Sequence, residues 1–347
     1  MTLTLAVRLD SDGDVLLAGP AVRALAQTST VDLLVSPAGQ AAARLLPDVR
    51  AVLVLDAPWT GYQPPAANPP ELMALVETLR HNGYDRVVIF TSFHQSPLPM
   101  ALLARLAGVP FVAGTSEDYP GSLLDVRHLR RGGHEVDAAL ELAVAAGAEP
   151  LADGGRLAVR HPLPPVGHLL PQGPFVVLHP CASVTSRSIG PDHARSLVRA
   201  LQASGRRVVV TGSAADAATT AAVLDGGSVE LTGRTTLDLT GRTTLAELAA
   251  VLEAADCLVS GNTGPAHLAA AVGTPVVSLF SPVVPAERWA PYGVPMALLG
   301  DQLASCRGSR ARDCPVAGHP CVSGVDPADV VAAVDRLVRQ PSQAAAR

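Results

Sequence analysis

The stretch 261–275, GNTGPAHLAAAVGTP, has the composition of a helix that begins directly after an apolar run. Its first residues include types that cap a helix or suit its first turn. Backbone N–H groups and the positive end of the helix dipole would attract an anion at this point. The residues concerned are Asn262, Thr263, Gly264, Pro265 and His267. Two interpretations are open: a capped helix that is simply buried, or a helix whose N-terminus binds a phosphate.

Two other polar segments follow apolar runs. In 179–191, HPCASVTSRSIGP, Ser183 and Thr185 offer hydroxyls, and Arg187 offers a planar cation that suits phosphate oxygens. In 208–216, VVVTGSAAD, the residues after the apolar run are Thr211, Gly212, Ser213 and Asp216. Asp216 would contact a ribose or would cap the following helix. Because ligands of doubly wound folds lie beyond the carboxyl ends of strands, these segments are candidates for a nucleotide site.

The segment 8–25, RLDSDGDVLLAGPAVRAL, has carboxylates at alternate positions after the first apolar run: Asp10, Asp12 and Asp14. The Gly and Glu that a calcium-binding EF loop requires are missing, so we exclude that site. A single general base is favoured, because Gly13 leaves room beside Asp14 near the start of a helix. A magnesium-binding carboxylate pair and a set of helix-capping residues are the alternatives.

Two further groups could take part in chemistry. Cys306, Cys314, His319 and Cys321 lie near the end of the chain, but their spacing lacks the paired C-x2-C of a zinc knuckle. We favour unpaired loop thiols over a metal site. His94, in TSFHQSPLP, follows an apolar run and would contact an acceptor or lie in a solvated loop.

Short Val/Leu-rich runs alternate with Ala/Leu-rich stretches, which is typical of parallel sheets covered by helices on both faces. The first half predicts strands at 3–10, 31–36, 51–56, 86–91 and 110–114 and helices at 18–27, 70–83 and 100–108. The second half predicts strands at 175–180, 206–213 and 257–261 and helices at 191–205, 215–227, 244–256 and 326–340. The pattern predicts an α/β fold with two domains.

The domains are separated by a Pro-rich segment, in which proline disfavours both a helix and a central strand. We take 161–174 as the linker between domains 1–160 and 175–325. In 231–246 the same seven residues occur twice in tandem, LTGRTTLDLTGRTTLA. We interpret this repeat as a local duplication that lengthens one surface loop.

Composition narrows the function classes. The formal net charge is −5 and the basic residues are scattered, so neither a nucleic-acid stripe nor a polybasic membrane patch is expected. Proline and glycine interrupt the uncharged stretch 257–286, which argues against a membrane span. No dinucleotide fingerprint, Walker loop or G-x-S-x-G elbow is present, which argues against a dehydrogenase, an ATPase and a hydrolase. Five Cys and no signal peptide favour a cytoplasmic protein.

Together these segments resemble glycosyltransferase family nine, the ADP-heptose:lipopolysaccharide heptosyltransferases. The segment 8–25 is similar to the family's opening strand, loop and helix, and 261–293 is similar to its donor-site signature. The resemblance implies a GT-B fold: two Rossmann-like, doubly wound parallel-sheet domains facing across a cleft, with the last helix, 326–340, packing back on the first domain. It implies inverting transfer of a sugar, favoured as heptose from ADP-heptose, to a hydroxyl of a glycan, glycolipid or small molecule, without a metal or other cofactor.

The resemblance also implies roles for individual residues. Asp14 would be the general base, with Asp12, Gly13 and His94 on the acceptor side. The donor side would consist of Ser183, Thr185, Arg187, Thr211, Gly212, Ser213, Asp216, Asn262, Thr263, Gly264, Pro265 and His267.

The chain departs from the family's pattern at three positions. Asn262 stands where Asp is usual, Ile189 where an aromatic residue is usual, and Arg187 where Lys is frequent. The missing charge at Asn262 would shift donor preference. Two other functions stay open: a nucleotide-sugar epimerase of related fold, and a homologue that binds a sugar nucleotide with weak turnover. A lipid acceptor would bring the enzyme to the inner face of the membrane, and the sequence does not fix an oligomeric state.

Overall fold

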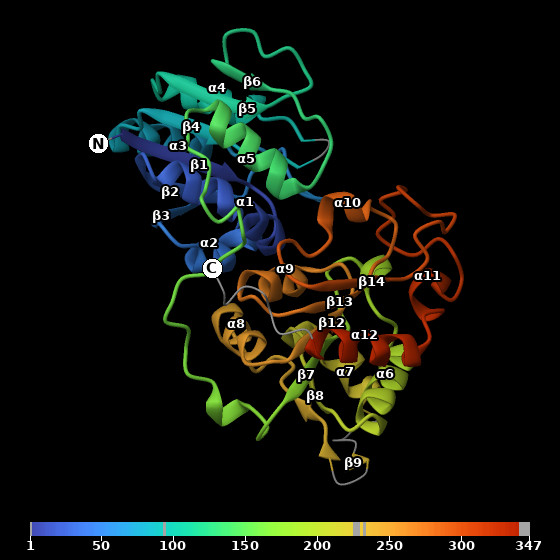
Figure 1. Ribbon diagram of the computed structural model, residues 1–347. Helices are drawn as coiled ribbons and strands as arrows, with labels where there is room; N and C mark the ends of the chain where they lie inside the picture. The colour runs from blue at the N-terminus through green and yellow to red at the C-terminus, as the bar shows by residue number, and fades with distance from the viewer. Residues whose placement is uncertain (1, 93–94, 225–229, 232–233, 340–347) are drawn as a thin grey trace. The chain divides into compact units, whose positions relative to one another are not determined.

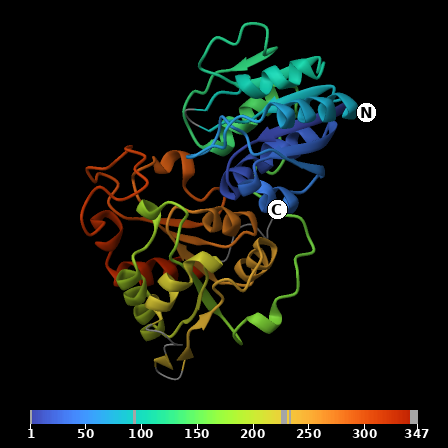
Figure 2. The same cartoon turned by 180° about the vertical axis from the view of Figure 1, so that it is seen from behind.

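The computed structural model describes residues 2–92, 95–224, 230–231 and 234–339. The chain divides into two compact units, Met1–Arg160 and His161–Arg347. Each unit contains a sheet flanked by helices (Figures 1 and 2). Within the described ranges, no helix is both long enough and apolar enough to cross a bilayer.

The first unit is built on a six-stranded parallel sheet. Its strands are β1 (Thr2–Arg8), β2 (Ser29–Val35), β3 (Val49–Val54), β4 (Arg86–Ile89), β5 (Phe111–Thr115) and β6 (Val126–His128). Their order is β3-β2-β1-β4-β5-β6, and every neighbouring pair is parallel. The parallel sheet predicted from nearly continuous apolar runs is confirmed.

Helices cover both faces of this sheet. They are α1 (Asp12–Ala26), α2 (Gln40–Leu45), α3 (Pro69–Asn82), α4 (Leu98–Leu106) and α5 (Glu135–Ala145). α1 contacts α2 and α5, whereas α3 contacts α4. Leu5, Val7 and Ile89 of the strands are buried in one core with Val76 of α3 and Met100 of α4.

The second unit repeats this architecture. Its main sheet contains β7 (Phe175–His179), β8 (Arg207–Val210), β11 (Leu237–Asp238), β12 (Cys257–Ser260), β13 (Val276–Leu279) and β14 (Met296–Leu299), in the order β11-β8-β7-β12-β13-β14. All neighbouring pairs are parallel. Two short strands outside this sheet, β9 (Glu230–Leu231) and β10 (Arg234–Thr235), pair antiparallel.

The helices of the second unit are α6 (Pro191–Ala203), α7 (Ala217–Val223), α8 (Leu245–Glu253), α9 (Gly264–Ala271), α10 (Ala286–Trp289), α11 (Pro320–Ser323) and α12 (Pro327–Arg339).

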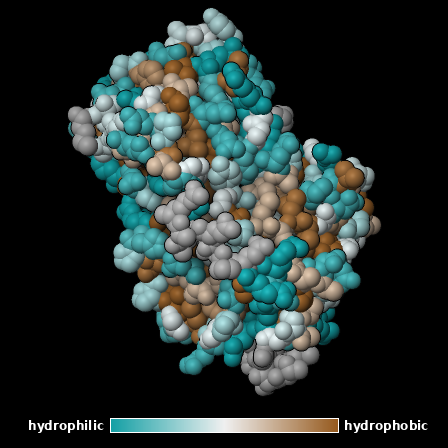
Figure 3. All heavy atoms as spheres, in the orientation of Figure 1, coloured by the Kyte–Doolittle hydropathy of each residue, from teal (hydrophilic) through white to brown (hydrophobic). Residues whose placement is uncertain are grey.

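Hydrophilic and apolar residues are interspersed over the face shown in Figure 3. The largest fully buried side chains include Phe280 in this unit and Leu5 and Leu16 in the first. Each unit therefore has its own apolar core.

The amphipathic helix predicted at 326–340 forms as α12 (Pro327–Arg339). Val330, Ala333, Val334 and Leu337 are spaced three and four residues apart and belong to the core of the second unit. α12 contacts α6, β13 and β14. The apolar face of α12 is therefore buried within the second unit, and packing of this helix on the first domain stays a prediction.

Two predictions of local structure need correction. The helix expected at 18–27 begins at Asp12, because carboxylates in a first turn are favoured by the helix dipole. The repeat 231–246 is not one surface loop. Where described, it contributes β11 to the sheet and Thr244 as the N-cap of α8.

Candidate active site

Both sheets have a switch point beside their first strand, where the order of the strands reverses. It lies between β1 and β4 in the first unit and between β7 and β12 in the second. Ligands of open parallel sheets bind beyond the carboxyl ends of the strands at such points. Predicted site residues follow these strands: Asp14 comes after β1, Arg187 after β7, and Thr263 after β12.

Asp14 lies in the first turn of α1, and its two carboxylate oxygens have different partners. Oδ2 accepts a hydrogen bond from the Ser11 hydroxyl at 2.8 Å, and Oδ1 accepts one from Arg8 Nη2 at 3.2 Å. The side chain retains 24% of its accessible surface. Asp14 is therefore oriented by two donors and still accessible, as a general base must be.

Arg8, the last residue of β1, is the cation around which the acidic groups gather. Its Nε lies 2.9 Å from Asp10 Oδ2, and its Nη2 lies 4.0 Å from Glu135 Oε2. Burial lowers the pKa of Arg8, but the carboxylates of Asp10, Asp14 and Glu135 outweigh burial and raise the pKa above its ordinary value. Arg8 therefore stays charged although it is buried.

The other two carboxylates of the acidic segment point to different partners. Asp10 accepts from Gln95 Nε2 at 2.6 Å, and burial raises the pKa of Asp10. Asp12 accepts from the backbone N–H of Ala42 in α2 at 2.8 Å, and burial raises its pKa as well. Gly13 is buried in the first turn of α1. The acceptor-side roles of Asp12 and Gly13 stay predictions, and His94 lies outside the described residues.

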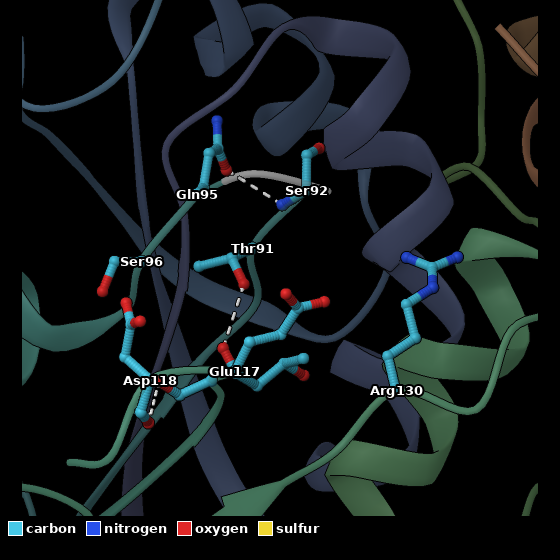
Figure 4. Close-up of a pocket in the computed structure, with 9 residues that line it drawn as sticks. Thr91, Ser92, Gln95, Ser96, Glu117, Asp118 and Arg130 are labelled. Atoms are coloured by element: carbon cyan, nitrogen blue, oxygen red, sulfur yellow. Dashed lines mark hydrogen bonds between the residues drawn. The ribbon is translucent and has the colours of Figure 1, made fainter. Parts of the chain in front are cut away.

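A cavity of about 160 Å³, which the sequence interpretation missed, opens beyond β4, β5 and β6. We call it the β4–β6 cavity. It is lined by Thr91, Ser92, Gln95, Ser96, Thr115, Ser116, Glu117, Asp118 and Arg130. Figure 4 shows Ser92 and Gln95 on one side of the opening, Glu117 and Asp118 opposite, and Arg130 on a third side. The signal in the sequence was the polar run that follows each apolar strand, TS after β4 and TSED at the end of β5.

In the second unit, the loops after β7 and β12 meet at Gly261. A Cβ atom on Gly261 would overlap the backbone carbonyl oxygen of Arg187. The absence of a side chain therefore lets the short 3-10 turn Thr185–Arg187 approach the residues that begin α9. Ser183, in the same loop, is exposed. The structure thus brings together two segments that the sequence analysis assigned to one donor site.

α9 begins as predicted, with Thr263 at the N-cap and Pro265 in the first turn. Among the described residues, the Thr263 side chain forms no capping hydrogen bond with the first turn of α9, and that turn contains no acidic residue. His267 follows in the helix and is buried. No side-chain cap and no carboxylate of the first turn therefore compensates the positive end of the helix dipole near Gly264. An anionic ligand could bind at this helix end.

Two predicted donor-side residues have protein partners. The Thr185 hydroxyl lies 2.8 Å from the Arg312 carbonyl oxygen and 2.6 Å from Asp313 Oδ1. Asp216 Oδ2 accepts from the backbone N–H and the hydroxyl of Ser213, each at 2.7 Å. These contacts form a capping box at the start of the turn Ala214–Asp216, which confirms the capping alternative for Asp216. A ribose contact stays a prediction.

Two buried groups lie near the ends of β7 and β8. The Thr211 hydroxyl is 2.9 Å from His179 Nδ1, and burial lowers the pKa of His179 to about 4. Burial and then the Asp216 carboxylate raise the pKa of Cys181 to about 12. Gly212, the next residue along the β8 loop, is half-buried. His179 and Cys181 are therefore both neutral at neutral pH.

Asn262 joins two loops of the second unit. Its Nδ2 donates to the Ser281 carbonyl oxygen at 3.4 Å, and its Oδ1 accepts from the Ser281 N–H at 3.3 Å. The residue is 7% exposed. A carboxylate has no N–H to donate, so an Asp could make only one of these two contacts.

The cysteine-rich segment near the end of the chain forms no disulfide. Cys306 and Cys321 are buried, and Cys314 is half-buried. Among the residues that the structure describes, no group of three or more His, Cys, Asp or Glu could hold a metal ion. The geometry therefore gives no support to the zinc alternative.

Comparison with known proteins agrees with the family resemblance found in the sequence. A family model described as glycosyltransferase family 9 (heptosyltransferase) matches residues 72–316. No curated protein shows a significant match to the sequence.

Several solved structures share the fold. The ADP-heptose lps heptosyltransferase II of E. coli has a TM-score of 0.75 and 19% identity, covering 98% of this chain and 99% of that one. A family 9 glycosyl transferase from Veillonella parvula has a TM-score of 0.77 and 16% identity, covering 98% of each chain. The E. coli heptosyltransferase WaaC with ADP-2-deoxy-2-fluoro heptose has a TM-score of 0.66 and 22% identity, covering 87% and 94%. These matches confirm the predicted α/β fold of the GT-B class.

Proposed function

Because the chain belongs to glycosyltransferase family 9, and is therefore a glycosyltransferase, we propose that it transfers a heptose from ADP-heptose to a hydroxyl group. The acceptor would be a glycan, a glycolipid or a small molecule. Support for the donor comes from the structural relatives, one of which is a WaaC heptosyltransferase with an ADP-heptose analogue.

The observation that carries the proposal is the setting of Asp14. The carboxylate lies beyond the carboxyl end of β1, at the switch point, between the Ser11 hydroxyl and the buried guanidinium of Arg8. The two donors fix the orientation of the carboxylate and leave part of it accessible, and a positioned carboxylate can take the proton of a hydroxyl group. Asp14 is therefore the residue to which we assign the general base.

In the proposed step, Asp14 takes the proton of the acceptor hydroxyl while the hydroxyl oxygen attacks the anomeric carbon of the donor sugar. The bond from that carbon to the diphosphate oxygen breaks, and the electron pair leaves with the nucleoside diphosphate. Attack from the face opposite the leaving group inverts the configuration at the anomeric carbon. Asp14 ends the step protonated, and the diphosphate carries the additional negative charge.

The second unit supplies what the leaving group needs. The N-terminus of α9 and the guanidinium of Arg187 come from loops that touch at Gly261. Oriented N–H groups and a fixed cation lower the barrier most where negative charge develops during the reaction. We assign the diphosphate to Arg187, Thr263 and Gly264, and we propose a reaction that uses no metal ion. A cytoplasmic location belongs to the same proposal, with lipid acceptors reached at the inner face of the membrane.

The test of the proposed base is Asp14→Asn. Asparagine keeps the shape but cannot take the proton, so the transfer rate should fall by about 10²–10⁴-fold. The affinity for ADP, measured by calorimetry, should stay within about twofold, because a general base assists the chemical step and does not hold the donor. Transfer is measured as ADP release with a panel of acceptors. The matched control is Asp137→Asn, since Asp137 lies in the first turn of α5.

Three outcomes separate the possible functions. Full activity of Asp14→Asn would exclude the assigned base. Conversion of the donor sugar without any acceptor would indicate an epimerase. ADP-heptose binding without turnover, with every acceptor supplied, would indicate a homologue that only binds the sugar nucleotide.

A further inference from the structure

We propose that the β4–β6 cavity of the first unit binds an uncharged, hydroxyl-rich sugar residue of the acceptor (Figure 4). The inference rests on the proposed function and adds to it the chemical class of the acceptor. That class is a neutral glycoside, with no carboxylate or phosphate on the sugar that enters the cavity.

The lining of the cavity matches a polyol. Hydroxyl side chains come from the end of β5 and from the segments after β4 and β5: Thr91, Ser92, Ser96, Thr115 and Ser116. The Gln95 amide also lines the cavity, and its contacts with Asp10 and the Ser92 N–H hold it in place. Hydroxyls both donate and accept, and the hydroxyls of a sugar do the same, so each can complete the other's hydrogen bonds. A volume of about 160 Å³ exceeds what one water needs and has room for part of a small polar ligand.

Charge excludes an anionic sugar. Glu117 and Asp118 line the cavity and are exposed. Carboxylates only accept, so they suit the O–H groups of a sugar and repel another carboxylate or a phosphate. Arg130 does not reverse this charge, because its Nη1 donates to Glu135 Oε1 at 2.5 Å and its Nη2 to the Gly133 carbonyl oxygen at 3.1 Å. The cavity is therefore net negative.

The loop that carries the two carboxylates is held in place within the first unit. Arg127 Nε donates to the Ser116 carbonyl oxygen at 3.0 Å, and its Nη2 donates to the Glu117 carbonyl oxygen at 2.5 Å. The Ser116 hydroxyl donates to the Asp118 carbonyl oxygen at 3.0 Å. A loop that is ordered before binding loses less entropy when the ligand arrives, so these contacts favour a binding role for its side chains.

The cavity wall continues to the assigned base. Ser92, a lining residue, accepts from Arg8 Nη2 at 2.6 Å, and the same nitrogen reaches Asp14 Oδ1 at 3.2 Å. A smaller adjoining hollow is lined by Arg8 together with Thr115 and Arg130. One guanidinium nitrogen thus connects the cavity to Asp14, so a sugar bound in the cavity can present a neighbouring hydroxyl to the base.

The first experiment measures sugar binding directly, without any transfer. Saturation-transfer NMR on the full chain compares methyl glucoside, galactoside and mannoside with the methyl glycosides of the corresponding uronic acids. The members of each pair differ only in that a CH2OH group is oxidised to a carboxylate. At least one neutral glycoside should bind, and its uronic acid should bind about tenfold or more weakly, because it would lose a charge-assisted hydrogen bond and meet a like charge.

The second experiment changes the charge of the cavity. Glu117→Gln should weaken the neutral glycoside about tenfold, and Glu117→Lys should reverse the preference within the pair. Glu149→Gln, at an exposed position in the same unit, is the matched control and should change neither affinity. ADP affinity should be the same in all variants, because the assigned donor residues belong to the second unit.

The outcomes distinguish this inference from the proposed function. Equal binding of a uronic acid and its neutral partner would overturn the inference, as would binding of no neutral glycoside or an unchanged preference in Glu117→Lys. Each of these results leaves ADP binding and the Asp14→Asn comparison unaffected. Conversely, the predicted sugar preference with no ADP binding would retain the cavity and overturn the proposed donor.

Discussion

A basic residue ends the first strand of each sheet, and at neutral pH one of the two is positively charged while the other is neutral. Arg8 ends β1 and His179 ends β7, and both are buried, at 3% and 8% exposure. Arg8 has the carboxylates of Asp10, Asp14 and Glu135 around it and remains a cation. His179 contacts the hydroxyl of Thr211, and burial lowers its pKa to about 4, so it is neutral. The side-chain type decides most of this difference, because a guanidinium stays protonated in proteins whereas burial alone is enough to keep an imidazole neutral at neutral pH. The carboxylates around Arg8 compensate for the burial of its charge.

The difference matches the chemistry that we assign to each unit. In the first unit, the buried cation Arg8 orients the Asp14 carboxylate, to which we assign the proton transfer. In the second unit, the buried histidine carries no charge, and the loops after β7 and β12 are free to direct a helix N-terminus and Arg187 at a ligand that brings its own negative charge. We therefore assign a base to the switch point of the first unit and an anion site to that of the second.

The largest effect expected from this comparison is that of Arg8→Met. Removing a buried cation leaves the Asp10 carboxylate, which is only 12% exposed, without its ion-pair partner, so the free energy of unfolding of the first unit should fall by about 3–5 kcal/mol at neutral pH. His179→Met removes a neutral base and one hydrogen bond, and should cost the second unit about 1–2 kcal/mol.

The two tryptophans allow each unit to be measured separately. Trp59 lies in the first unit and Trp289 in the second, so urea unfolding followed by fluorescence in Trp289→Phe and Trp59→Phe backgrounds reports on one unit at a time. If Arg8→Met and His179→Met cost their units the same free energy, the two buried bases do not differ in charge state.

The second effect is the pH dependence that His179 contributes to the stability of the second unit. The pKa of His179 is about 4 in the folded chain and about 6.5 when exposed in the unfolded chain. As the pH falls from 6.5 towards 4, the unfolded state binds a proton that the folded state does not. Stability present above pH 6.5 is therefore lost, by up to about 3 kcal/mol.

His179→Asn should remove this loss. The measurement is the difference in unfolding free energy between pH 7 and pH 4.5 for wild type and variant, in the Trp59→Phe background. Arg8 is charged over the whole range and should contribute no slope of this kind to the first unit. An unchanged difference in His179→Asn would mean that the histidine is not held neutral by the fold.

Much of this fold could be predicted from hydrophobic runs, and the exceptions have physical reasons. Long apolar strands such as β1 and β7 are buried on both faces, and so they stand out in the sequence. β6 has three residues, VRH, and is held at the sheet edge by backbone pairing with β5, which leaves no apolar pattern to detect. The amphipathic face of α12 was predicted, but its spacing could not tell which unit would bury it.

The repeat shows most directly that context overrides local sequence. Thr236 and Thr244 occupy the same position in two identical seven-residue segments. Thr236 is buried and accepts from Gln202 Nε2 at 2.8 Å, whereas Thr244 caps α8 and accepts from the Glu247 N–H at 3.2 Å. A helix-forming sequence follows only the second copy, so only that copy can supply an N-cap.

The positions of candidate residues could be predicted where they follow directly after a strand, and not where they depend on partners distant in the sequence. Asp14 and the start of α9 could be found from local pattern. The pairing of Arg8 with Glu135 could not, because the two residues come from separate elements that only the fold brings together. The β4–β6 cavity was missed for the same reason, since its lining comes from the ends of three strands.

The smallest of the three effects on stability concerns the contact between the loops of the second unit. In Gly261→Ala the added methyl group meets the backbone carbonyl of Arg187, which cannot rotate away as a side chain could. Overpacking of this kind should lower the unfolding free energy of the second unit by about 1–3 kcal/mol. Because the methyl group separates Arg187 from the start of α9, the ADP affinity should fall by more than the loss of stability alone would cause. Gly190→Ala is the matched control, since a Cβ there meets no atom within 4 Å. If Gly261→Ala binds ADP as wild type does, the approach of these loops is a feature of packing, and the diphosphate must bind elsewhere in the second unit.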